Sequence, residues 1–311
     1  MERLNGKDGF LTYYSKLFPY NSIDQIIDAL NKQNFPALIY STHNKIIIEK
    51  IWEQDQIQFT TLPWFNNAIL WPANKELGTI LPGYQENLFY PMNVSSLLPV
   101  IAINPQQDEV ILDSCAAPGG KTIAMKFGTH QPFQLLCNDL SYHRTQIMRE
   151  IFQSMNLSDI QVINYPAETI YQKFTDTFDK ILLDAPCSSE KHVWKNPKEL
   201  NQWSTNRIKE LQQRQYALVS GLVLALRPGG ILVYSTCAVN REKNELLIEK
   251  VLQKKSDLVK LVPFNVSIIP GESGMQTDPP LSYDLNNVRR IPLINDSRLD
   301  PMFVAILQRL L

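Results

Sequence analysis

The sequence predicts an α/β protein built on a doubly wound, mostly parallel sheet, with a smaller α+β region in front of it. Two observations support this prediction. Short apolar runs alternate with helix-forming segments over residues 95–311, which is typical of parallel strands joined by crossover helices. Reactive polar side chains directly follow several of these runs, at the strand ends where open sheets of this class bind ligands. A chain of 311 residues, 44% of them hydrophobic, is long enough for both regions.

Residues 1–94 are expected to form the smaller region. The elements predicted there are a helix over 23–31, capped by Asn21 or Ser22, and short strands over 37–41 and 45–51. The stretch from Trp52 to Tyr90 is rich in aromatic residues. Such rings stack on unpaired bases in RNA-binding proteins, but aromatic residues at irregular spacing also build cores. Both interpretations stay open.

Residues 95–311 are expected to form the larger domain. Its first helix is predicted to be capped by Ser95 or Ser96 and to end at Asn104-Pro105. The remaining elements, in order, are strands over 110–112, 133–137, 160–163, 180–183, 231–234 and 302–307, with helices after Gly120 and over 142–155, 206–226 and 242–252.

An acid and two thiols follow neighbouring signals in this series. Asp184 ends the run 178–183 and Cys187 comes three residues later, while Cys237 closes the run 230–234. If these two strands are neighbours, both thiols and the carboxylate face one pocket. Unpaired cysteines also serve as small buried hydrophobic residues, but two of them at two strand ends favour a functional site.

The cysteine pattern argues against a disulfide framework or a zinc ribbon. The four cysteines, Cys115, Cys137, Cys187 and Cys237, are widely separated and contain no Cys-x-x-Cys pair. The four histidines show no ligand spacing near them. We therefore expect no metal site.

The segment from Asp113 to Thr122 joins the first strong strand to its helix and is a candidate ligand loop. Its small residues and the pair Gly119-Gly120 allow backbone to approach a ligand closely. The segment matches neither Gly-x-Gly-x-x-Gly nor Gly-x-x-x-x-Gly-Lys-Ser/Thr, because Cys115 stands where the second pattern needs glycine. A pyrophosphate cradle is therefore disfavoured.

A second acid points to the ligand. Asp139 ends the next strand, 19 residues after Gly120, close to the spacing at which an acid in such folds accepts hydrogen bonds from ribose hydroxyls. Asp139 could also simply cap the following helix. A nucleoside that is held by its ribose and carries no diphosphate suggests S-adenosylmethionine.

Composition bounds the partners and the compartment. A net charge of −1 does not indicate a nucleic-acid binder, although lysines and arginines gather between 191 and 214, either as phosphate contacts or as a solvated helix face with intrahelical ion pairs. No run is long enough for a membrane helix and the first residues lack the apolar region of a secretory signal. The expected compartment is the cytoplasm, with no membrane contact.

Four segments together resemble the signature sequences of the Sun family of RNA (cytosine-5) methyltransferases. They are CAAPGGKT at 115–122, NDLSYHR at 138–144, DAPCSS at 184–189 and YSTCAVNREKNE at 234–245. The family usually has an acid after the third strand, where Asn164 or Glu168 stands here. The resemblance implies a class I S-adenosylmethionine-dependent methyltransferase with a seven-stranded Rossmann-like sheet, acting as a monomer on cytosine carbon 5 in ribosomal or transfer RNA.

The resemblance also implies roles for individual residues. Cys237 is the nucleophile toward carbon 6 of cytosine, Cys187 assists removal of the carbon 5 proton and release of product, Asp184 holds the base, and Lys121 helps to keep Cys237 ionised. The residues expected to bind the cofactor are Cys115, Ala116, Ala117, Pro118, Gly119, Gly120, Lys121, Asp139, Arg144 and Asp184.

The RNA itself is expected to contact residues 1–94 and, through its phosphates, basic side chains of 191–214 together with Arg289 and Arg290. One alternative is a non-catalytic RNA-binding ribosome assembly factor of the same fold. Another, a methyltransferase acting on amino groups of nucleic acids, is disfavoured because Asp184-Ala185-Pro186-Cys187 is not the Asn/Asp-Pro-Pro-aromatic motif of that class.

Overall fold

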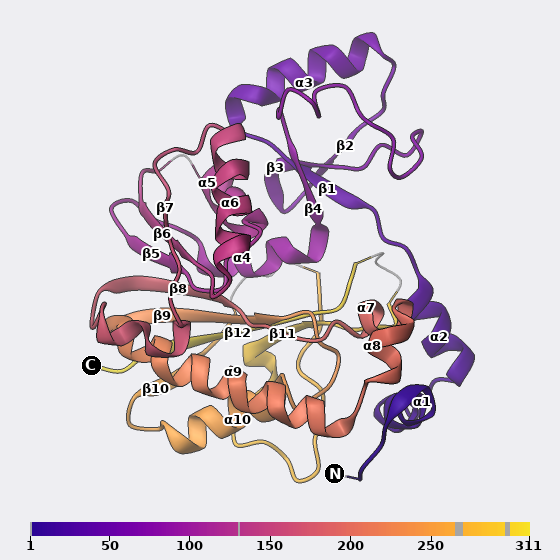
Figure 1. Ribbon diagram of the computed structural model, residues 1–311, viewed down its shortest axis with the longest axis vertical. Helices are drawn as coiled ribbons and strands as arrows, with labels where there is room; N and C mark the ends of the chain where they lie inside the picture. The colour runs from indigo at the N-terminus through magenta and orange to yellow at the C-terminus, as the bar shows by residue number, and fades with distance from the viewer. Residues whose placement is uncertain (1, 130, 265–269, 296–298) are drawn as a thin grey trace.

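The computed structural model describes residues 2–129, 131–264, 270–295 and 299–311 and confirms the predicted α/β fold (Figure 1). The larger domain contains a sheet with the strand order β10-β12-β9-β8-β5-β6-β7, and β11 pairs with β12 beside β10. Strands β5 to β9 pair in parallel, whereas β12 is antiparallel to its neighbours. The strands are β5 (Val110–Asp113), β6 (Gln134–Asn138), β7 (Gln161–Ile163), β8 (Phe178–Asp184), β9 (Leu226–Thr236), β10 (Val259–Val262), β11 (Val288–Ile291) and β12 (Met302–Arg309).

Helices cover both faces of this sheet, which is why its central strands are almost continuously apolar. The helices α4, α5 and α6 lie on one face, and α9 and α10 lie on the other (Figure 1). The helical elements of this domain are η1 (Val94–Ser96), α4 (Leu97–Ile103), α5 (Gly120–Gly128), α6 (Tyr142–Ser154), η2 (Ala167–Gln172), α7 (Glu190–Lys195), α8 (Pro197–Asn201), α9 (Thr205–Ala225), α10 (Glu245–Lys254) and η3 (Leu285–Asn287).

The chain changes direction at β5, and this positions the site. From β5 the chain runs outward through β6 to β7, and then returns to pair β8 with the other edge of β5. Loops after β5 and β8 therefore leave the sheet in opposite directions and open a crevice at its carboxyl edge. The polar segments singled out in the sequence all begin at this edge.

The first 93 residues divide into two parts that pack in different places. The helices α1 (Gly6–Leu17) and α2 (Ile23–Asn31) lie beside α7 and α8, in a cluster that includes Phe10 and Trp203. A lobe above the large sheet contains a four-stranded antiparallel sheet and α3 (Figure 1). The elements of the lobe are β1 (Pro36–Ile39), α3 (Thr42–Gln54), β2 (Thr60–Leu62), β3 (Phe65–Leu70) and β4 (Tyr90–Asn93).

One predicted strand in this lobe is wrong. Residues 45–51 belong to helix α3 rather than to a strand. The hydroxyl of Ser41 accepts a hydrogen bond from the backbone of Asn44 and caps the helix, and Ile48 and Trp52, four residues apart, face the core. The β-branched run 46–48 favours a strand, but the cap and the helical spacing outweigh this preference.

Other details also differ from the sequence prediction. The helix α2 has the expected Ser22 cap, whereas the 3₁₀ turn before α4 is capped by Asn93 rather than by Ser95 or Ser96. The strands β2, β3, β4, β10 and β11 and the helices α1, α7 and α8 were not predicted. Of the aromatic stretch, Trp52, Phe65 and Phe89 are buried, which favours the core interpretation for these three rings.

Candidate active site

The two cysteines predicted to share a pocket are in contact. Strands β8 and β9 pair in parallel with Asp184 opposite Ser235, so the loops that carry Cys187 and Cys237 leave the sheet side by side. The Sγ atoms of Cys187 and Cys237 lie 2.8 Å apart, as a hydrogen-bonded pair of free thiols. The condition set by the sequence, that the two strands be neighbours, is met.

The two thiols titrate as a pair. The hydrogen bond from Cys237 lowers the pKa of Cys187, although burial opposes this effect. The same hydrogen bond, together with burial, raises the pKa of Cys237. The pair therefore loses its first proton more readily than an isolated thiol and holds the second more firmly. One proton can pass between the sulfurs, so either sulfur can act as the thiolate.

Asp184 and Lys121 form an ion pair beside the thiols. The Nζ atom of Lys121 donates to Asp184 Oδ2 at 2.6 Å, and the hydroxyl of Ser235 donates to Asp184 Oδ1 at 2.9 Å. Burial favours the neutral amine of Lys121, but the negative charge of Asp184 outweighs it and raises the lysine pKa. Lys121 is thus a cation held at the rim of the thiol site.

The loop between β5 and α5 packs closely against α6 at Gly119. Gly119 has φ +109°, and a Cβ atom there would stand 2.7 Å from the ring of Phe152, so only glycine fits. A cavity of about 210 Å³ opens in front of the loop. It is lined by Tyr90, Pro91, Met92, Ser96, Asp113, Cys115, Ala116, Ala117, Pro118, Gly120, Lys121 and Asp184.

One acid and one thiol in the lining of this cavity have raised pKa values, and a second thiol lies in the core. Asp113 accepts a hydrogen bond from the hydroxyl of Thr122 at 2.7 Å, and burial raises its pKa to about 7. Burial likewise raises the pKa of Cys115 to about 12, so this thiol is neutral and inert at physiological pH. Cys137 is fully buried and belongs to the core.

Asp139 lies at the end of β6 beside the same loop. Its carboxylate accepts from the backbone of Ser141 at 2.9 Å and pairs with Arg144 Nη1 at 3.2 Å. Arg144 also donates to the backbone oxygen of Ala117, which ties it to the glycine loop. The carboxylate can therefore turn to a ribose while the half-exposed guanidinium moves aside.

Asn164 and Glu168 are the two candidates to replace the acid that the family usually has after the third strand. The side chain of Asn164 donates to the backbone oxygen of Asp139 at 2.7 Å, so it lies at the same edge. Glu168 is on η2, and its backbone packs against Gly221 of α9 on the opposite face of the sheet. Of the two residues that could replace the usual acid, Asn164 is the one near the site.

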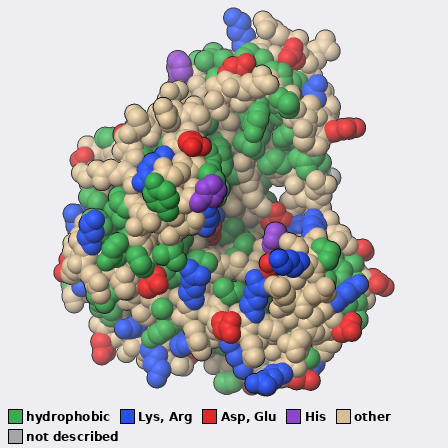
Figure 2. Space-filling view, in the orientation of Figure 1, with side chains coloured by type: hydrophobic (Ala, Val, Ile, Leu, Met, Phe, Trp, Pro, Cys, Tyr) green, Lys and Arg blue, Asp and Glu red, His purple; other side chains and the backbone are tan. Residues whose placement is uncertain are grey.

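A second cavity, of about 420 Å³, contains Cys237 in its lining. Its walls come from α7, from the segment before β1 and from the segment before β12, and they include Lys32, Lys191, His192 and Lys195. Figure 2 shows the surface hollowed below the N-terminal lobe, with Lys and Arg side chains on the lower border. Ser96 lines both this cavity and the one in front of the glycine loop, so the two adjoin.

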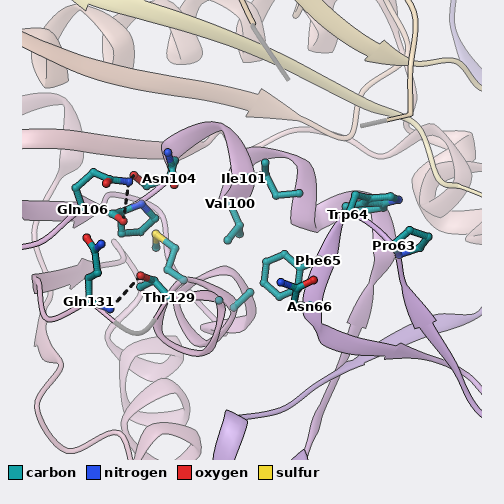
Figure 3. A pocket seen from close by; sticks show the side chains of 14 residues that line it. Pro63, Trp64, Phe65, Asn66, Val100, Ile101, Asn104, Gln106, Thr129 and Gln131 are labelled. Carbon is teal, nitrogen blue, oxygen red and sulfur yellow. Dashed lines mark hydrogen bonds between the residues drawn. The ribbon is translucent and has the colours of Figure 1, made fainter. Parts of the chain in front are cut away.

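The largest cavity, of about 530 Å³, lies elsewhere, between the turn from β2 to β3 and the ends of α4 and α5 (Figure 3). Trp64 and Phe65 border it on one side and Gln106 and Gln131 on the other. None of the catalytic or cofactor residues predicted from the sequence lines it, and none of its described lining residues has a titratable side chain. Its size alone does not make it the active site.

The structure adds residues that the sequence did not indicate. Tyr90 and Ser96 reach the first cavity from the end of the N-terminal lobe. The carboxylate of Asp300 accepts from Asn34 Nδ2 at 2.8 Å, from Lys191 Nζ at 2.6 Å and from the side chain of Asn93. The signal in the sequence was an acid, Asp300, that stands directly before the apolar run of β12.

Arg290 was expected to contact phosphate, and this is wrong. The residue is 1% exposed, and its guanidinium donates to both carboxylate oxygens of Glu245, at 2.9 and 2.7 Å. Arg207 pairs with Glu199 of α8, 2.8 Å away, rather than within its own helix.

In the described part of the chain no group of three or more His, Cys, Asp or Glu side chains is arranged to hold a metal ion. Among the described helices, none combines the length and the apolar character needed to cross a membrane.

Residues 100–308 match the family model described as 16S rRNA methyltransferase RsmB/F. The chain is 30% identical over 265 residues to the ribosomal RNA small subunit methyltransferase F of Aliivibrio salmonicida, covering 82% of this chain and 56% of that protein. It is 32% identical over 257 residues to the protein of the same name from Aeromonas hydrophila, covering 79% and 54%. The chain thus spans about half the length of these relatives.

Two solved structures share the fold. A methyltransferase homolog protein from Pyrococcus horikoshii has a TM-score of 0.76 and 26% identity, over 93% of this chain and 90% of that one. NSun6 from the same organism, crystallised with SFG, has a TM-score of 0.79 and 18% identity, over 97% and 98%. At 18% identity the second likeness concerns the fold alone.

Proposed function

Because this chain belongs to the 16S rRNA methyltransferase RsmB/F family, as its motifs led us to expect, we propose that it transfers a methyl group from S-adenosylmethionine to carbon 5 of a cytosine in structured RNA. The observation that supports this proposal most directly is the contact of two thiols, 2.8 Å apart, beside a carboxylate and an ammonium group. This arrangement supplies a nucleophile, a base and a group that can hold a pyrimidine edge.

The reaction requires a nucleophile because carbon 5 of cytosine is too electron-poor to take a methyl group unaided. In our proposal the thiolate of Cys237 adds to carbon 6. A carbon–sulfur bond forms, and the electron pair of the 5,6 double bond makes carbon 5 nucleophilic. Cys237 is the cysteine that lines the larger of the two adjoining cavities, which is where we place the cytosine.

Asp184 and Lys121 prepare the first half of this reaction. In its protonated form Asp184 is to donate to nitrogen 3 of the ring and to accept from the exocyclic amine, exchanging its present partners Lys121 and Ser235 for the base. The ammonium of Lys121, released from that carboxylate, then stabilises negative charge near Cys237, since nearby cations favour the thiolate.

Cys187 carries out the second half. Once carbon 5 holds both a hydrogen and a methyl group, the Cys187 thiolate takes the proton. The electron pair of the broken carbon–hydrogen bond restores the 5,6 double bond and expels Cys237 as a thiolate. The proton that Cys187 first shared with Cys237 has gone to solvent, so one proton is released in each cycle.

We place the cofactor in the smaller cavity and against the adjoining end of β6. When bound there, S-adenosylmethionine supplies an electrophilic methyl group and leaves as a thioether. Gly120 keeps this cavity open, because a Cβ atom there would stand 3.1 Å from the ring of Tyr90, which also lines the cavity. We assign the ribose to Asp139, with Arg144 and Asn164 beside it, and the methionine end to the segment 115–121.

Residues 1–94 are proposed to help recognise the RNA. Lys32 lines the cavity that contains Cys237 together with Lys191, His192 and Lys195, so this part of the chain contributes to the wall of the proposed entrance. These basic side chains suit the phosphates on either side of a cytosine that has left its stack. The adduct assay described next, with transcripts of both kinds, distinguishes ribosomal from transfer RNA as the substrate.

The covalent adduct tests this proposal. Cys187→Ala is expected to stop after methyl transfer and to leave a protein–RNA adduct that survives a denaturing gel, whereas Cys187→Ala/Cys237→Ala forms none. Transcripts of 16S rRNA and of tRNAs, incubated with S-adenosylmethionine, serve as probes. An adduct in the double variant refutes the assignment of the nucleophile. No adduct and no methylation with any RNA favours the non-catalytic RNA-binding alternative.

A further inference from the structure

A buried ion pair lies directly behind the two thiols. Lys243 is fully buried and Glu190 is 2% exposed, and Lys243 Nζ lies 3.3 Å from Glu190 Oε1. Burying two opposite charges costs several kcal/mol of desolvation, which their attraction repays only when the surrounding hydrogen bonds are good. Neither residue lines the cofactor cavity or the cavity that contains Cys237. The pair therefore calls for an explanation other than substrate contact.

Each member of the pair holds one of the cysteine loops. Lys243 Nζ donates to Ser188 Oγ at 2.9 Å and to the Ser188 carbonyl at 3.3 Å, one residue after Cys187. Glu190 Oε2 accepts from the backbone of Val239 at 2.8 Å, two residues after Cys237. The ion pair thus connects the two loops.

Glu190 has further partners that fix its position. Its Oε1 accepts from Tyr14 OH at 2.8 Å and from Asn240 Nδ2 at 3.1 Å, so four donors converge on one carboxylate. Tyr14 belongs to α1, which closes this region from outside. The carboxylate has no freedom to turn, and neither has the ammonium that it faces.

The proposed reaction creates a need for this ammonium. In the free protein the hydrogen bond from Cys237 is the main influence that favours the Cys187 thiolate, and the charge of Lys243 acts in the same direction. When Cys237 becomes bonded to carbon 6, it no longer has a proton to donate. Lys243 then remains as the nearby positive charge that favours ionised Cys187.

Resting on the function proposed above, we infer that Lys243, held by Glu190, is a positioning residue for the second half of the reaction. It keeps Cys187 beside Cys237 and favours the thiolate that removes the carbon 5 proton. Lys121, held by Asp184, serves the first half. Each cysteine thus has its own lysine.

Loss of Lys243 should stop the reaction before the carbon 5 proton is removed. Lys243→Met keeps the length of the side chain and removes the charge. We expect turnover to fall about 100-fold, the effect of a small misplacement of a reacting group, with KM for RNA nearly unchanged. The protein–RNA adduct should accumulate, as in Cys187→Ala. Lys254→Met, at the exposed end of α10, is the matched control and should behave as the wild type.

A second variant guards against misfolding. Lys243→Met alone leaves Glu190 without its counter-ion, so Glu190→Gln/Lys243→Met removes both charges and keeps an acceptor for Val239. Calorimetry with S-adenosylmethionine identifies the folded variants. A folded variant with normal turnover overturns the inference, and so does one that loses turnover without accumulating adduct. If the wild type does not methylate RNA and the Cys187→Ala variant forms no adduct, it is the proposed function that fails.

Discussion

Arg290 provides a prediction that separates stability from RNA binding. The sequence suggested a phosphate contact, but the guanidinium is buried against Glu245 and stacks on the ring of Phe303 at 5.8 Å. It also donates to the backbone oxygen of Val239 at 2.9 Å, within the loop that follows Cys237. Arg290→Met should therefore unfold more easily and bind RNA normally wherever it is folded.

The loss of stability in Arg290→Met follows from the few hydrogen-bond partners that Glu245 keeps. Without Arg290, the buried carboxylate of Glu245 keeps only the backbone N–H of Met275, at 2.9 Å, among the hydrogen bonds described here. Breaking a buried pair in this way costs about 3–5 kcal/mol, which corresponds to a loss of roughly 5–15 °C in Tm for a chain of this size. Arg290→Met/Glu245→Leu removes both charges and should recover most of the loss, since apolar replacement of both partners is often neutral.

Urea unfolding followed by circular dichroism measures the effect, and filter binding of RNA at low urea measures affinity. Arg289→Met is the matched control for the unfolding measurement only, since Arg289 is an expected phosphate contact. Arg289 is partly exposed, and the hydrogen bond that it donates to the backbone oxygen of Gly271 is long, at 3.4 Å. Arg289→Met should therefore change the free energy of unfolding by less than about 0.5 kcal/mol. If Arg290→Met unfolds like the wild type and binds RNA more weakly, the reasoning from burial is refuted.

Two further predictions concern the cofactor and the thiols. Asp139→Asn should weaken the binding of S-adenosylmethionine about 10-fold or more, because a hydrogen bond to a charged acceptor is lost; calorimetry measures this, and unchanged affinity would remove Asp139 from the site. Because the hydrogen bond from Cys237 lowers the pKa of Cys187, the Cys187 thiolate persists to lower pH than that of a free cysteine. Iodoacetamide should therefore label Cys187 at lower pH in the wild type than in Cys237→Ala, as read by mass spectrometry, and identical pH profiles would contradict the shared proton.

The sequence located the site because its parts lie at strand ends. Asp139, Asp184 and Cys237 each follow an apolar run, and a parallel sheet brings such ends to one edge. Hydrophobic periodicity carries no comparable information about long-range side-chain partners. That Arg290 turns inward to Glu245 depends on the pairing of β11 with β12, and β11 was not predicted.

Missing information on long-range packing also explains why predictions near the amino terminus are wrong or incomplete. The run 46–48 has the β-branched composition of a strand, and only the cap at Ser41 and the spacing of Ile48 and Trp52 identify a helix. Tyr90 of β4 reaches the cavity in front of the glycine loop because the lobe packs over α5. No local pattern in the sequence specifies that packing.

The register of β8 against β9 determines whether the thiols can meet. Adjacent strands are about 4.8 Å apart, and Asp184 stands opposite Ser235 with their side chains hydrogen-bonded on one face. A slip of one residue would move one of these side chains to the other face, and the loops that carry Cys187 and Cys237 would leave at different heights. The sheet can bring the two sulfurs near each other but cannot hold mobile loops to 2.8 Å. The ion pair of Glu190 and Lys243, anchored in both loops, supplies that remaining constraint.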